Sequence, residues 1–212
     1  MNKRVLILTI ILVLVAAAAF IFIQKKRHAA NLPPHREIDI SGQPTLNKDA
    51  KIQIVAFEDL KCSNCKRYNV ELYPEIKKQY LDTGKASYTT ITLAFIPGSI
   101  PAANAALCAA EQKTEFYFDF TDYIFHNQPS EMLNWATSET LLEFAGHVEG
   151  INKEALKSCM SSDRYNSRIS LNMKIAQTAM PEVVATPAIF INGYQLEQLN
   201  MDAVNKLVKD TA

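Results

Sequence analysis

Two cysteines three positions apart, Cys62 and Cys65, stand where an apolar segment gives way to one with helical spacing. Residues 51–59 (KIQIVAFED) are rich in β-branched and aromatic side chains, which predicts a buried strand. Across residues 62–81 apolar side chains recur at helical intervals, and Pro74 is expected to kink this helix. The sequence therefore places both cysteines in the first turn of a helix that directly follows a buried strand.

The first turn of a helix is a position that favours an ionised thiol. Its unsatisfied N–H groups and the positive end of the helix dipole stabilise a thiolate, which predicts a pKa for Cys62 below that of a free cysteine. Cys65 lies one turn deeper on the same face and is better shielded. We therefore expect Cys62 to be the attacking nucleophile and Cys65 the resolving thiol. Ser63 and Asn64, between them, are expected to give polar support.

Two other interpretations of this cysteine pair remain open. A zinc site needs four ligands, and the remaining candidates are Cys108, Cys159 and four histidines. These residues form neither a second C-x-x-C nor a pair of histidines at zinc-ligand spacing, so we expect no metal site. A purely structural thiol pair is the second alternative.

Beyond residue 85 the sequence alternates between strand patterns and a long helical block. A second strand is expected over residues 86–95, and only helical segments from Pro101 to about residue 180. Within this block we expect a capping box at Thr140–Glu143 and an N-cap at Asn152. The remaining signals predict a strand, a turn, a short strand and a helix, at residues 183–192, Asn192-Gly193, 194–196 and 200–209.

A proline, Pro187, interrupts the strand expected over residues 183–192, although proline is disfavoured inside a central strand. A cis bond between Thr186 and Pro187 would turn the end of the strand and leave backbone groups facing the thiols. An extended substrate chain could pair with those groups. We therefore expect a cis bond packed against Cys62 and Cys65; the alternative is a trans proline on an edge strand.

The two remaining cysteines, Cys108 and Cys159, both fall in the helical block. In an oxidising compartment two such cysteines are expected to form a structural disulfide. The alternative is a pair of buried free cysteines that behave as small apolar residues. Four cysteines that form two sensible pairs favour a domain exported from the cytoplasm.

The N-terminal residues predict attachment to a membrane. Val5–Ile23 is a run of nineteen residues without a charge, long enough to span a bilayer core and longer than the apolar stretch of most signal peptides. We expect residues 1–24 to form an uncleaved signal anchor or transmembrane helix, and residues 25–36 to be a tether. The alternative is that the N-terminal segment is cleaved and the domain is exported. The folded domain is then expected over residues 37–212, with its helical insertion at about 100–180.

Composition excludes several classes of protein. Lysine plus arginine equals aspartate plus glutamate at 22 each, and no basic–aromatic stripe is present, so we expect no nucleic-acid partner. The six glycines form neither a P-loop nor a dinucleotide-binding motif. We therefore expect no nucleotide and no other cofactor.

These motifs together resemble the DsbA family of thioredoxin-fold oxidoreductases. The resemblance covers roughly residue 51 to the C-terminus, and it rests on an apolar strand, F-x-D-x-x-C-x-x-C, a kinked helix, a strand, a helical insertion and T-P-x-x-F-x-N-G. The matching residues are Phe57, Asp59, Cys62, Cys65, Thr186, Pro187, Phe190, Asn192 and Gly193.

The resemblance implies an α/β fold, a thioredoxin core with an inserted all-helical domain, preceded here by the N-terminal anchor. It also implies dithiol–disulfide exchange with the cysteines of unfolded or folding secreted proteins, outside the cytoplasm and facing the periplasm or cell exterior. Reoxidation by a membrane partner of the quinone-linked type is a further implication. The alternatives to a disulfide-introducing enzyme are a disulfide reductase or isomerase, and a thiol-based metal carrier.

The chain departs from this family pattern at two points. Strong oxidants of the family resemble C-P-H-C, whereas Ser63-Asn64 gives weaker stabilisation of the thiolate, so we expect a milder redox poise. Many relatives carry a buried acid six residues before the first cysteine, and Ala56 occupies that place. Glu58 and Asp59 could assist proton transfer instead, but we expect them to be solvated charges at the end of the strand.

Overall fold

The computed structural model describes residues 7–17, 19–20 and 32–211 in two compact units, residues 1–35 and residues 36–212. In the first unit residues 7–17 and 19–20 are helical, with apolar side chains exposed. Among the described residues, no helix has both the length and the apolar character that crossing a membrane requires. Part of the expected anchor at 1–24 and most of the expected tether at 25–36 lie outside the described residues, so both stay predictions.

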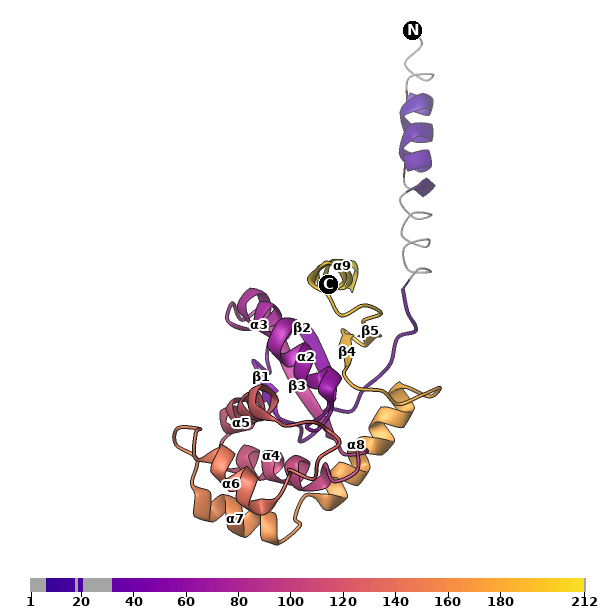
Figure 1. Cartoon of the computed structure of the whole chain (residues 1–212). Coiled ribbons are helices and arrows are strands. Elements are labelled where there is room, and N and C mark those ends of the chain that lie inside the picture. Colours follow the sequence, from indigo (N-terminus) through magenta and orange to yellow (C-terminus); the bar gives the residue numbers. More distant parts are fainter. Residues whose placement is uncertain (1–6, 18, 21–31, 212) are drawn as a thin grey trace. The chain divides into compact units, whose positions relative to one another are not determined.

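The second unit is built on a five-stranded sheet in the order β1-β3-β2-β4-β5 (Figure 1). The central pair is parallel and the three other pairings are antiparallel. The strands are β1 (Thr45–Leu46), β2 (Ile52–Asp59), β3 (Ala86–Leu93), β4 (Ala188–Ile191) and β5 (Tyr194–Gln195). In the parallel pair Asp59 lies opposite Leu93, so the carboxyl ends of β2 and β3 meet at the same edge of the sheet.

The connection from β2 to β3 begins with the cysteine-bearing helix. It contains α2 (Ser63–Glu71), α3 (Tyr73–Ile76) and a π-helical turn, η1 (Lys77–Leu81). The expected single helix over 62–81 is therefore divided, and the break falls at Leu72, before the proline rather than at it. Pro74 has no N–H to donate and restricts the residue before it, so it is accommodated in the first turn of a new helix.

A block of five helices is inserted between β3 and β4: α4 (Ile100–Gln112), α5 (Thr114–Asn127), α6 (Ser138–Ala145), α7 (Lys153–Ser161) and α8 (Asn166–Ala179). The alanine-rich α4 packs into the core of this block because its small side chains allow the neighbouring helices to approach closely. Helix α8 also covers β3, where the Asn172 side-chain amide donates to the carbonyl of Thr92 at 2.9 Å. The helix α9 (Met201–Thr211) ends the fold beside β4.

The thioredoxin-like α/β fold with a helical insertion, expected from the resemblance, is the fold of this chain. The expected strand at 183–192 is shorter and begins only at Ala188, because Pro187 cannot donate to the strand ladder. The expected capping box at Thr140 is wrong: Thr137 is the N-cap of α6 and its hydroxyl accepts from the N–H of Thr140 at 3.3 Å. Asn152 is the N-cap of α7, as predicted.

A disulfide between Cys108 and Cys159 joins α4 to α7 inside the helical insertion. The S–S distance is 1.98 Å and the two Cα atoms lie 5.8 Å apart. Both residues are buried, so the bond crosses the core of the insertion rather than its surface.

Replacing both residues of this disulfide, Cys108→Ala with Cys159→Ala, should lower the free energy of unfolding by about 4 kcal/mol, because the bond closes a loop of 51 residues in the unfolded chain. Denaturation by urea without reductant measures the loss. The unmodified protein in strong reductant is the control and should lose a similar amount. A loss below about 1 kcal/mol would show that the bond does not restrict the unfolded chain as we expect.

Candidate active site

Cys62 is the N-cap residue of α2, at the turn that leads out of β2. Its backbone N–H donates to the carbonyl of Asp59 at 3.0 Å, which closes the turn, and its own carbonyl accepts from Lys66 at 3.0 Å, which starts the helix. Only 6% of Cys62 is exposed, and Cys65 is fully buried. Both cysteines are free thiols in this structure.

Hydrogen bonds make Cys62 the more acidic of the two thiols. The backbone N–H of Cys65 donates to the Cys62 sulfur at 3.4 Å. The pKa of Cys62 is lowered from 9.0 to about 6, chiefly by its hydrogen bond with the Cys65 side chain. Burial acts against this lowering, while the Thr186 side chain and the N–H groups of Cys65 and Asn64 reinforce it. Cys62 is therefore largely a thiolate at neutral pH.

Cys65 has the opposite character. Burial raises its pKa well above 9.0, and its hydrogen bond with Cys62 and the nearby charge of Glu58 raise it further. One cysteine of the pair is thus poised to attack or to leave as a thiolate, and the other holds its proton. This asymmetry is what a nucleophile and a resolving thiol require.

The backbone of Asn64 acts on the Cys62 sulfur, whereas both the backbone and the side chain of Ser63 act on Glu131. The N–H of Ser63 donates to a carboxylate oxygen of Glu131 at 2.8 Å. The N–H of Asn64 acts on the Cys62 sulfur, while the Asn64 side-chain oxygen accepts from Arg67 at 3.2 Å. Neither side chain is hydrogen-bonded to a thiol, so the polar support expected of them comes from the helix terminus itself.

The Thr186–Pro187 segment approaches Cys62 from another part of the chain. The peptide bond between these residues is cis. The Cys62 sulfur lies 3.5 Å from the carbonyl oxygen of Thr186, to which the protonated thiol donates. The Thr186 hydroxyl is buried, and its side chain helps to lower the pKa of Cys62. The sequence pair that was expected to face the thiols is therefore beside Cys62.

The expectation that Glu58 and Asp59 are solvated is wrong, because both side chains are bonded inward and only 2% and 0% exposed. One carboxylate oxygen of Asp59 accepts from the N–H of Lys61 at 2.9 Å. The other accepts from the N–H groups of Phe95 and Ile96 and from the Ser99 hydroxyl, at 3.0, 3.0 and 2.9 Å. Asp59 thus joins the turn before Cys62 to the loop that enters the helical insertion.

Glu58 is a buried acid beneath the cysteine helix. Its carboxylate accepts from the Asn69 amide and, at 3.2 Å, from the Tyr88 hydroxyl. The Asn69 amide also donates to the carbonyl of Cys65 at 3.0 Å. Burial raises the pKa of Glu58 to about 7, with Asn69 and Tyr88 opposing the change. Glu58 can therefore exchange a proton near neutral pH, close to the thiol that holds one.

Alternation along β2 explains how Glu58 reaches this place. Side chains two residues apart in a strand point to the same face, so Glu58 shares a face with Ala56, where the resemblance placed an acid. The shared face of Ala56 and Glu58 can be predicted from the sequence, but the burial of Glu58 cannot. A small cavity of about 10 Å³ adjoins Glu58, Tyr88 and Tyr117, enough for about one water molecule.

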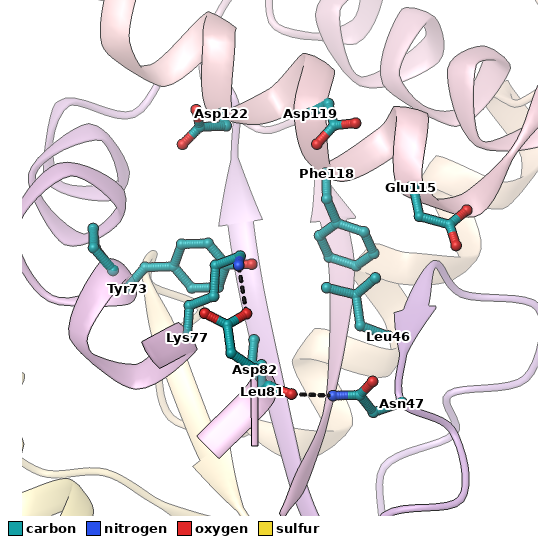
Figure 2. A pocket seen from close by; sticks show the side chains of 11 residues that line it. Leu46, Asn47, Tyr73, Lys77, Leu81, Asp82, Glu115, Phe118, Asp119 and Asp122 are labelled. Atoms are coloured by element: carbon teal, nitrogen blue, oxygen red, sulfur yellow. Dashed lines mark hydrogen bonds and ion pairs between the residues drawn. The ribbon is translucent and has the colours of Figure 1, made fainter. Parts of the chain in front are cut away.

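An acidic groove lies away from the thiols, between η1 and α5 (Figure 2). The groove has a volume of about 480 Å³ and an apolar floor that includes Phe118. Helix α5 contributes three carboxylates to its wall. Lys77, also in the lining, forms an ion pair with Asp82 at 2.5 Å. Neither cysteine lines it. Within the described part of the chain, no group of three or more histidine, cysteine, aspartate or glutamate residues is arranged to hold a metal ion.

Comparison with known proteins gives consistent results. A family model described as thioredoxin matches residues 46–210. Disulfide bond formation protein D of Bacillus subtilis is 30% identical over 155 residues, which span 72% of this chain and 69% of that protein. A putative protein-disulfide oxidoreductase of Rickettsia bellii is 27% identical over 81% of this chain, but the match spans only 65% of that longer protein.

Two solved structures are similar in both fold and sequence. The oxidised form of BdbD from Bacillus subtilis has a TM-score of 0.77 and 26% identity, covering 85% of this chain and 98% of that one. DsbA from Chlamydia trachomatis has a TM-score of 0.74 and 30% identity, covering 84% of this chain and 96% of that one.

The thiolate of Cys62 should titrate with a midpoint near pH 6 in the reduced protein. Ultraviolet absorbance of the thiolate measures the midpoint, and the Cys62→Ala variant serves as the blank. Cys65→Ala should move the midpoint upward, because the Cys65 side chain is the largest contribution that lowers the pKa of Cys62. A midpoint near 9 in the unmodified protein would contradict the stabilisation described here.

Glu58 should make the stability of the oxidised protein, in which neither active-site thiol titrates, fall as pH rises. Its pKa is about 7 when folded against an ordinary 4.5, so the folded state binds more protons between these values. The free energy of unfolding should drop by about 3 kcal/mol across that window.

Urea denaturation at pH 5 and pH 8 measures this drop. Glu58→Gln should abolish most of it, whereas Glu71→Gln, an exposed residue of α2, should keep it. An unchanged pH dependence in Glu58→Gln would show that Glu58 is ionised in the folded state at pH 5.

Proposed function

Because this chain belongs to the thioredoxin family, and its relatives are named as disulfide-forming proteins and protein-disulfide oxidoreductases, we propose that it is a protein thiol–disulfide oxidoreductase acting through Cys62 and Cys65. The observation that carries the proposal is the unequal acidity of the two thiols, a thiolate at a helix N-terminus beside a fully buried thiol. A structural or metal-binding pair has no need of this difference.

In the disulfide-introducing direction, a substrate thiolate attacks the sulfur of Cys62 in the oxidised enzyme. The Cys62–Cys65 bond breaks, a mixed disulfide forms, and Cys65 leaves as a thiolate that takes up a proton. Glu58 is placed to supply that proton, because it lies beneath Cys65 and has a pKa of about 7. A second substrate thiolate then attacks the substrate sulfur and releases Cys62. The substrate loses two electrons, and the enzyme gains them.

The acidity of Cys62 favours this direction. The released group is a thiolate stabilised by the helix N-terminus, so the reduced enzyme is favoured and its disulfide is oxidising. The enzyme must then be reoxidised by a partner that accepts two electrons. We propose a membrane redox protein of the quinone-linked type for this role, with unfolded or folding secreted proteins as substrates.

We propose that the reaction takes place outside the cytoplasm. A structural disulfide, Cys108–Cys159, is typical of proteins in oxidising compartments. The relatives named for disulfide bond formation support the same assignment. Attachment to the membrane through residues 1–24 is part of the proposal and is supported by the uncharged run Val5–Ile23.

A reductase or isomerase is the second candidate, and one observation favours it. The N–H of Ser63, at the terminus that stabilises the Cys62 thiolate, is already bonded to the carboxylate of Glu131. An anion in that position makes the pair less oxidising. The equilibrium constant of the Cys62–Cys65 pair with glutathione decides between the two directions.

Loss of either active-site cysteine should give a distinct defect with a reduced model protein as substrate. Cys62→Ala should abolish disulfide formation because the nucleophile is absent. Cys65→Ala should accumulate mixed disulfides with the substrate, seen on non-reducing gels, because the resolving thiol is missing. Ser158→Ala, an exposed residue of α7, is the control and should keep full activity. Full activity in Cys62→Ala would refute the proposal.

A further inference from the structure

The connector between α5 and α6, residues 128–137, lies against the N-terminus of the cysteine helix. The Gln128 side chain donates to the carbonyl of Cys62 at 3.3 Å, and the Gln128 carbonyl accepts from the Lys66 ammonium at 3.1 Å. Three residues further on, Glu131 accepts from the N–H of Ser63 at 2.8 Å. The helical insertion thus contacts three of the five residues from Cys62 to Lys66.

The Ser63 N–H is one of the groups that make this helix terminus able to stabilise an anion. It belongs to the first helical residue, so it has no partner within the helix. The first turn of α2 contains no acidic residue of its own. The carboxylate that takes this N–H is therefore supplied from 68 residues away.

Glu131 is an anion under the conditions in which Cys62 titrates. Hydrogen bonds from the backbone and the side chain of Ser63, helped by the positive charge of Lys61, keep the pKa of Glu131 below its usual value. The carboxylate and the Cys62 thiolate therefore compete for the same helix terminus. Two anions at one site disfavour each other, and the carboxylate also removes an N–H from the field that the thiolate experiences.

We propose that Glu131 is a positioning residue whose carboxylate opposes thiolate formation at Cys62 and so gives the cysteine pair a less oxidising poise. The inference rests on the proposed dithiol–disulfide function and adds to it a regulator from outside the thioredoxin core. It adds a second reason, beside the Ser63-Asn64 dipeptide, to expect a milder redox poise.

None of the other charged groups around Cys62 that the structure describes is bonded to the Ser63 N–H at the N-terminus of α2. Lys61 is buried and its ammonium donates to the carbonyl of Pro97 at 2.8 Å, and Lys66 is held by Gln128. The remaining titratable groups that act on Cys62 lie beneath the helix or within it: Glu58 and Cys65. Glu131 is thus the carboxylate at the exposed end of the site.

The test compares Glu131→Gln with the unmodified reduced protein. Glutamine keeps an oxygen that can accept from Ser63, so only the charge is removed. The acid dissociation constant of Cys62, from thiolate absorbance, should rise about threefold to tenfold, the range for a partly solvated charge pair. The equilibrium constant for oxidation of glutathione by the Cys62–Cys65 disulfide should rise by up to the same factor. A tenfold rise corresponds to a reduction potential about 30 mV higher. Glu139→Gln, an exposed acid at the start of α6, is the matched control and should change neither value.

A second variant separates the contact with Ser63 from any general effect of the mutation. Ser63→Pro removes both the N–H and the side-chain hydroxyl that act on Glu131. A proline fits there because it is the first helical position and Cys62 is extended, with φ −67° and ψ 122°. In this background the effect of Glu131→Gln should shrink to less than about twofold, because the carboxylate is no longer held at the terminus.

The two proposals fail separately. If Glu131→Gln leaves the titration of Cys62 unchanged while the protein still oxidises substrate, the role of Glu131 is refuted and the function stands. An undiminished effect in the Ser63→Pro background also refutes this role, because the hydrogen bond would then not carry it. If the unmodified protein shows no exchange activity, the proposed function fails, although the titration still reports whether Glu131 acts on Cys62.

Discussion

The buried carboxylate of Asp59 fixes the local geometry from which the site is built. It accepts hydrogen bonds from the turn before Cys62 and from the loop after β3, and it is fully buried between them. Since β2 and β3 are parallel, both loops leave the sheet at the same edge. One side chain therefore aligns the start of the cysteine helix with the entrance to the helical insertion, which is the arrangement that every other contact at the site requires.

The two thiols have different pKa values because they lie at different depths in the protein. Cys62 lies at the helix terminus, where N–H groups point at its sulfur, and Cys65 lies one turn further in with no solvent contact. Glu58 is buried in the sheet below, and its charge works against ionisation of Cys65. A thiolate is thus stabilised at Cys62 and destabilised at Cys65. This difference sets the order of the proton and electron transfers in disulfide exchange.

The helical insertion is more than a cover for the sheet. Its connector supplies Gln128 and Glu131 to the N-terminus of α2, and the Cys108–Cys159 disulfide stabilises the block from which that connector extends. The chain that returns from the insertion brings Thr186 to the other side of Cys62. Cys62 therefore contacts two segments that lie before and after α6–α8 in the sequence, so the insertion and α2 must fold against each other for these contacts to form.

The sequence by itself determined features that depend on neighbouring residues, such as the strand that leads to Cys62 and the N-cap at Asn152. Backbone chemistry and side-chain alternation act over a few residues, and so they can be read locally. Only the tertiary structure decided that Glu58 is buried and that Glu131 reaches Ser63, because burial depends on which elements pack over a side chain. A charged residue at a strand end is identical in sequence whether water or a helix covers it.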